Sequence, residues 1–155
     1  MIRRKGRILA FQALYSYDVG GVPLDELLKL EWQENEVEKD NNSEENASRD
    51  GASLETNSNE AEDFARLLIS GTINHIDEID DIIKKHLTGK WEFGRINKVS
   101  LAILRMSVFS LLYQKDLAPP IVIDEAISIS KKYGTDDAFK FINAILDTIS
   151  KEMQS

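Results

Sequence analysis

Apolar residues recur at helical spacing along most of this 155-residue chain, and no segment alternates apolar and polar residues as a strand would. Gly20 and Gly21 interrupt the first periodic stretch, and Pro23 opens the next one. The third stretch has a candidate break at Asn74 and His75. We therefore predict an all-α fold. The predicted helices cover residues 3–18, 24–30, 64–87, 97–114 and 121–133, with a last helix that Thr135 or Asp136 caps.

The helix predicted over 97–114 is the most apolar, because Val, Leu, Ile, Met and Phe side chains lie nearly all round it. Such a helix must be covered on most sides, so we expect it at the centre of the fold. Arg105 is the only charge in the middle of this helix and needs an acidic partner. We expect that partner to be Glu125 or Asp147.

The C-terminal part of the chain carries clear boundary signals. Pro119 and Pro120 end the loop after the central helix, and Gly134 stands at the usual C-terminal cap position of the helix over 121–133. The last helix has an apolar face that we expect to point into the core. Its members are Phe139, Ile142, Ile145, Leu146 and Ile149.

One segment, residues 34–58, is rich in Asn, Ser, Glu and Asp and shows no apolar periodicity. It offers too little apolar surface to offset the entropy of ordering, so we predict a flexible, disordered insertion. The rest divides into two predicted helical subdomains. Residues 1–33 with 59–88 form the first, and residues 89–155 form the second.

The charge of the chain is distributed unevenly. The formal net charge is −8, yet residues 31–63 alone hold 12 of the 27 acidic residues and only 2 of the 19 basic ones. The remainder of the chain is therefore slightly basic. The overall acidity does not argue against a polyanionic ligand bound outside residues 31–63.

The first predicted helix opens with the basic residues Arg3, Arg4, Lys5 and Arg7. Such a cluster suits phosphate groups and favours RNA or DNA binding, although a merely solvated terminus has the same composition. At about 100° per residue, the arginines share an arc with the apolar stripe of the helix. They cannot all pack beneath it, so we expect the first turn to overhang the bundle or to fray.

Other candidate chemistry is weak. Without cysteine there is no disulfide or thiolate metal site, and no apolar run is long enough to span a bilayer. Asp80 and Asp81 precede Lys84 and Lys85 by four residues, which favours helix ion pairs over a metal site. No phosphate loop or hydrolase motif is present, and His75 and His86 lack metal-ligand spacing. We expect a non-enzymatic, cytoplasmic binding protein without cofactor or metal.

Several ordered motifs together resemble the NusB family of bacterial transcription antitermination factors. Arg3-Arg4-Lys5-Gly6-Arg7 with Gln12-Ala13-Leu14-Tyr15 is similar to the N-terminal signature of that family. The stretches 102–106, 124–127 and 131–134 resemble its C-terminal helices, and 137–147 resembles its closing motif. The resemblance covers nearly the whole chain except about residues 31–60.

The resemblance implies two helical subdomains and binding to boxA RNA together with NusE, a ribosomal protein. It further implies assembly into the transcription elongation complex and support of ribosomal RNA operon transcription. From spacing alone Tyr15 and Phe141 are core residues, whereas the resemblance places them in the site, Tyr15 also near NusE. The surface around 91–100 departs from the family pattern, so no NusE contact is transferred there. The implied RNA site comprises Arg3, Arg4, Lys5, Arg7, Gln12, Tyr15, Asp137, Lys140 and Phe141.

Two other functions fit the same residues. NusB-like domains also precede the catalytic domain of ribosomal RNA cytosine methyltransferases, so the chain could be a helical module for ribosomal RNA processing or modification. No cofactor loop and no space for a catalytic domain support that alternative here. A protein-binding scaffold would bind NusE without affinity for RNA. The acidic segment is either an inert spacer or a competitor of RNA for the arginines.

Overall fold

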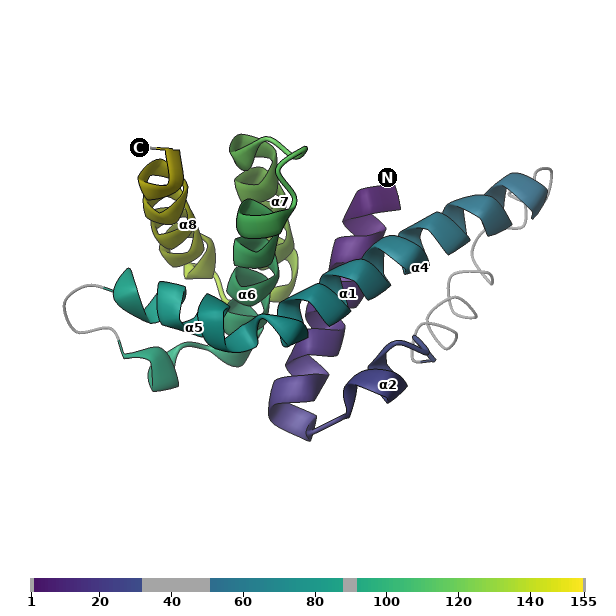
Figure 1. The fold of residues 1–155 in the computed structure, drawn as a ribbon, viewed down its shortest axis with the longest axis horizontal. Coiled ribbons are helices and arrows are strands. Elements are labelled where there is room, and N and C mark those ends of the chain that lie inside the picture. The colour runs from purple at the N-terminus through teal and green to yellow at the C-terminus, as the bar shows by residue number, and fades with distance from the viewer. Residues whose placement is uncertain (1, 32–50, 88–91, 155) are drawn as a thin grey trace.

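The computed structural model describes residues 2–31, 51–87 and 92–154, with side chains from residue 59 onward in the second range. The described residues are helical, without strands, which confirms the predicted all-α class (Figure 1). The helices are α1 (Ile2–Gly20), α2 (Leu24–Leu27), α4 (Gly51–Asn74), α5 (Ile76–Lys85), α6 (Lys98–Tyr113), α7 (Pro119–Tyr133) and α8 (Ala138–Gln154), with a short 3-10 helix η1 (Phe93–Arg95) before α6.

Helix α6 lies at the centre of the fold, as its composition predicts. It packs against α1, α4, α5, α7 and α8, and every side chain from Ser100 to Leu111 is buried. Around it, α1 packs along α4 while α7 packs along α8 (Figure 1). One continuous apolar core contains residues of all these helices. The division into two subdomains remains a prediction, because α6 joins the two helical groups.

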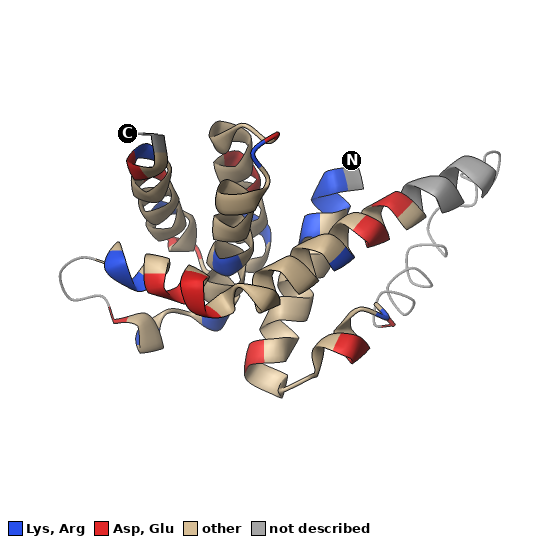
Figure 2. Ribbon diagram, viewed as in Figure 1, with Lys and Arg blue, Asp and Glu red and all other residues tan. Residues whose placement is uncertain are grey.

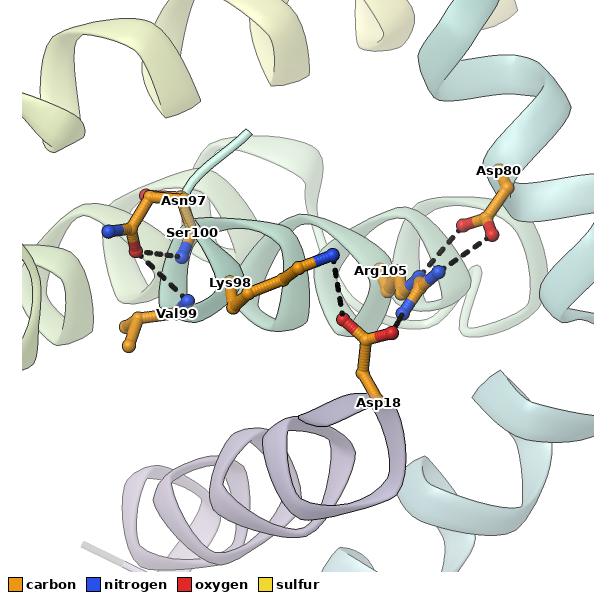
Figure 3. Close-up of polar contacts among 7 residues, drawn as sticks. All are labelled: Asp18, Asp80, Asn97, Lys98, Val99, Ser100 and Arg105. Atoms are coloured by element: carbon orange, nitrogen blue, oxygen red, sulfur yellow. Dashed lines mark hydrogen bonds and ion pairs between the residues drawn. The ribbon is translucent and has the colours of Figure 1, made fainter. Parts of the chain in front are cut away.

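Local chemistry explains most helix boundaries. The Asn97 side-chain oxygen accepts hydrogen bonds from the backbone N–H groups of Val99 and Ser100 at 3.0 and 3.3 Å, which caps α6 (Figure 3). Pro119 and Pro120 occupy the first positions of α7, where the missing N–H costs nothing. The chain breaks at His75 between α4 and α5, which confirms the predicted interruption.

Three boundaries differ from prediction. Helix α4 begins at Gly51 rather than Phe64, because an apolar pattern records only the turns that pack and not the helical turns before them. The last part of the predicted insertion is therefore helical, and residues 34–50 lie outside the described residues. Helix α2 ends at Leu27, and α8 begins at Ala138, whose N–H donates to the carbonyl of Thr135 at 3.2 Å.

The reason for glycine at position 134 differs from the predicted one. Gly134 has φ −93° and ψ −174°, so it does not need the left-handed conformation of the usual cap. An added Cβ would instead lie 2.8 Å from the carbonyl oxygen of Ser130. Close backbone approach, not backbone handedness, excludes a side chain here.

The expected partners of Arg105 are wrong. Its Nε and Nη2 atoms donate to the two carboxylate oxygens of Asp80, both at 2.8 Å, and Nη1 lies 3.8 Å from Asp18 (Figure 3). Burial lowers the pKa of Arg105, but the bonds and charge of Asp80, with the charge of Asp18, outweigh this and raise it. Arg105 therefore ties α6 to α5 and to the end of α1. Sequence spacing reports the need for an acid but not which helix supplies it.

The charged residues of α5 also pair differently from prediction. Asp80 is used by Arg105, while Lys84 Nζ lies 4.9 Å from the ring centroid of Phe93. Lys85 forms an ion pair with Glu152 of α8 at 3.8 Å. These side chains make contacts between elements rather than along one helix, because neighbouring helices lie within their reach.

Four of the five residues predicted to point inward from α8 are buried, namely Ile142, Ile145, Leu146 and Ile149. Phe139 is the exception and is only half-buried. The Nζ atom of Lys131 lies 4.8 Å from the centroid of its ring. No helix in the described part of the chain has the length and apolar character needed to cross a bilayer.

Candidate nucleic-acid interface

The basic start of α1 is an ordered part of the fold. Gly6 is buried against α4, where an added Cβ would lie 2.8 Å from the Phe64 ring and 2.9 Å from the carbonyl oxygen of Ala61. Glycine therefore allows α1 to approach α4 closely. The expectation of an overhanging or frayed first turn is wrong, because α4 and α7 both contact this turn.

Helix α7 contacts the first turn through an ion pair. Arg4 donates from Nε and Nη2 to the two carboxylate oxygens of Glu125, both at 3.0 Å. The side chain of Glu125 is 13% exposed, whereas that of Arg4 is 49% exposed. Hydrogen bonding to Arg4, together with the charges of Arg4 and Arg7, lowers the pKa of Glu125 below its ordinary value despite burial. The pair is a bidentate clamp with one side open to solvent.

Arg7 lies beneath this surface. It is only 4% exposed, and its guanidinium carbon lies 5.4 Å from the ring centroid of Phe64. Burial lowers the pKa of Arg7, the charge of Glu125 opposes that shift, and the charges of Arg3 and Arg4 add to it. In this conformation Arg7 supports the surface from below and does not present its guanidinium group to a phosphate.

Arg3, Arg4 and Lys5 are the cations that α1 exposes (Figure 2). Arg3 also lies over the Phe64 ring, with its guanidinium carbon 6.0 Å from the centroid. Farther along the helix Gln12 is half-buried, and Tyr15 is 38% exposed. At 100° per residue, Tyr15 returns to within about 20° of the direction of Arg4. The exposed aromatic ring therefore lies on the same side of α1 as the ion pair.

A second contact aligns α1 with α7. The rings of Phe11 and Tyr133 lie 5.1 Å apart, one position along each helix beyond the pair of Arg4 with Glu125. The short connection after Tyr133 then leads directly into α8. The N-terminal end of α8 thereby adjoins the surface formed by α1 and α7, which we call the α1–α7 face.

The α8 residues of the predicted site have mixed exposure. Asp137 and Lys140 are exposed and form an ion pair of 3.6 Å. Phe141 is half-buried and packs against the core, so it combines the structural and the site interpretation. Of the predicted set, Arg3, Arg4, Lys5, Tyr15, Asp137 and Lys140 are exposed, Gln12 and Phe141 are half-buried, and Arg7 is buried.

Sequence reasoning missed several residues of the α1–α7 face. Lys132 Nζ lies 5.3 Å from the ring centroid of Tyr133, which is 37% exposed. Lys131 and Phe139 form a similar pair beside it. The adjacent lysines and tyrosine before Gly134 carry the basic-aromatic signal, but periodicity alone assigns them to the end of a helix. Glu125 carries no such signal.

The described residues contain no group of three His, Cys, Asp or Glu side chains that could hold a metal ion. The two histidines make structural contacts. His75 stacks on Tyr113 with centroids 4.3 Å apart, and His86 bonds to the Ile82 carbonyl and to Glu152. The chemistry that the α1–α7 face offers is therefore binding, with exposed cations beside aromatic rings.

The ion pair between Arg4 and Glu125 predicts a pH dependence. Because the pKa of Glu125 is lower in the folded protein than in the unfolded chain, its contribution to stability is present above the unfolded pKa. That contribution should disappear as the pH falls through the folded pKa. We expect urea unfolding at a series of acidic pH values to show a steeper loss of stability for the wild type than for Glu125→Gln. Parallel curves would contradict this expectation.

Comparison with known proteins places this geometry in context. The sequence model of the NusB family matches residues 4–151. The chain is 47% identical over 150 residues to transcription antitermination protein NusB of Treponema denticola, which covers 97% of this chain and 96% of the relative. It is 35% identical over 153 residues to the protein of the same name from Nitratiruptor sp., which covers 99% and 94%.

Solved structures show the same fold. T. maritima NusB superposes with a TM-score of 0.72 at 32% identity, covering 97% of this chain and 91% of that one. A chain in a crystal structure of antitermination factors NusB and NusE in complex with dsRNA gives a TM-score of 0.73 at 29% identity, covering 97% of both.

Proposed function

Because this chain belongs to the NusB family, we propose that it acts as a transcription antitermination factor that binds RNA together with NusE. Its RNA target would be a single strand of the boxA type, and the complex would join the transcription elongation machinery in the cytoplasm to support ribosomal RNA operons. The relative solved with NusE and dsRNA supports the choice of partners. The relatives are antitermination proteins, which favours this function over a module for RNA modification.

The observation that carries the proposal is the α1–α7 face. Three exposed cations, Arg3, Arg4 and Lys5, lie at one end of α1, and Tyr15 lies farther along the same helix. Cations hold the phosphate backbone without reading sequence, whereas exposed rings stack on unpaired bases. Phosphate contacts would therefore set affinity, and the aromatic end of the face, completed by NusE, would set specificity.

Replacing Arg3, Arg4 and Lys5 together with alanine should weaken binding to a boxA-type single strand and flatten its salt dependence. Each lost phosphate contact should reduce the slope of log K against log salt by about 0.7. Arg7 is left intact because it is buried. Fluorescence anisotropy titrations at several salt concentrations measure both quantities.

The matched control replaces Lys29, Lys115 and Lys151, which are exposed on other parts of the surface, with alanine. It removes the same charge and should leave the slope close to that of the wild type. An equal loss in both triple variants would assign the effect to net charge and contradict an RNA site on the α1–α7 face.

The partnership with NusE has its own test. Titrating the RNA with and without NusE should show tighter binding in its presence, because the two proteins would share the RNA. Binding of NusE with no affinity for RNA, alone or in the complex, would instead identify a protein-binding scaffold.

A further inference from the structure

The ion pair between Arg4 and Glu125 leaves part of the arginine available. Glu125 accepts from Nε and Nη2, which lie along one edge of the guanidinium group. The Nη1 end is not used by this carboxylate, and the Arg4 side chain is 49% exposed. A guanidinium group can bind a second oxyanion through its other edge, since its donors point outward in a fixed plane.

Glu125 also lies among three like charges. Its pKa is lowered by Arg4 and Arg7, and Arg7 in turn is affected by the charges of Arg3 and Arg4. Arg7 Nη2 is buried and has no hydrogen-bond partner in the described part of the chain. Without the carboxylate, three guanidinium groups would repel one another beside a desolvated arginine. Glu125 is therefore the counterion that lets the cations gather at the start of α1.

We propose that Glu125 is a positioning residue of the RNA site, which fixes the guanidinium group of Arg4 so that its free edge meets an RNA phosphate. This inference rests on the proposed function, because it concerns how the same face holds RNA. Glu125 lies on α7, a helix well separated in sequence from the basic segment, and it need not touch RNA itself. A held arginine loses less side-chain freedom on binding than a mobile one.

The test compares Glu125→Gln with Asp124→Asn, the exposed neighbour on α7. Both variants remove one negative charge, so they change the long-range attraction of RNA equally. Only Glu125→Gln disturbs Arg4. We expect Glu125→Gln to bind a boxA-type single strand about 2- to 5-fold more weakly than Asp124→Asn, the range for an exposed ion pair. Circular dichroism and thermal unfolding establish that both variants are folded.

A double-mutant cycle separates positioning from a general structural effect. In an Arg4→Ala background, Glu125→Gln should have no further effect on RNA affinity, because the residue it positions is absent. Glu125→Asp keeps the charge but shortens the side chain, and should lose affinity as Glu125→Gln does. An effect of Glu125→Gln that persists in the Arg4→Ala background would overturn the proposal.

Other outcomes are equally decisive. Tighter binding by Glu125→Gln than by Asp124→Asn would overturn the proposal and show that the carboxylate competes with RNA for Arg4. Wild-type binding that is insensitive to Arg4→Ala would also overturn it while leaving the proposed function intact. Failure of the wild-type protein to bind RNA at all would overturn the proposed function first, so the two failures are distinguishable.

Discussion

Replacing Arg105 with alanine should lower the free energy of unfolding by about 3–5 kcal/mol, the cost of removing one partner from a buried ion pair. Arg105 is 7% exposed and bonds both oxygens of Asp80 at 2.8 Å. Its removal would leave Asp80 and Asp18 without their shared cation in a partly buried site (Figure 3). Urea unfolding measures the loss, which would consume much of the stability of an ordinary domain.

Arg105→Lys provides the matched control. Lysine retains the charge but cannot reproduce the planar, two-bond contact with Asp80, so its loss should fall between zero and that of alanine. If the alanine variant lost less than about 1 kcal/mol, the junction would behave like a surface ion pair. The ionic contact between α1, α5 and α6 would then not be a major source of stability.

Gly71→Ala should destabilise the protein by about 1–3 kcal/mol, the typical cost of inserting atoms into a packed core. The direction opposes helix propensity, which favours alanine over glycine by about 1 kcal/mol. An added Cβ at position 71 would lie 2.2 Å from Cζ and 2.4 Å from Cε1 of Phe109. Because Phe109 is buried on the central helix α6, its ring cannot easily move away. Chemical denaturation of the two proteins measures the difference.

Gly94→Ala is the control for that substitution. Gly94 is exposed in η1, and nothing lies within 4 Å of the position its Cβ would take, so stability should change by no more than about 0.5 kcal/mol. Combining Gly71→Ala with Phe109→Leu should cost less than the sum of the two single changes, because the smaller side chain relieves the clash. Strict additivity would contradict the proposed contact.

The predicted RNA site illustrates how far sequence reasoning reaches. Residues exposed on one helix, such as Arg3, Lys5 and Tyr15, could be found because a motif and its helical spacing lie within one short segment. Arg7 belongs to the same motif, yet the structure buries it under Phe64. Burial depends on how closely α4 approaches α1. That distance follows from Gly6, whose role is visible only when both helices are in place.

By itself, the sequence determined the helical class, the central position of residues 98–113 and the family to which the chain belongs. These follow from periodicity, apolar composition and ordered local motifs, which are properties of neighbouring residues. Only the tertiary structure decided that Arg105 pairs with Asp80 and that Glu125 holds Arg4. A buried or clamped charge needs a partner for electrostatic reasons, but helix packing determines which acid, near or distant in sequence, comes within reach.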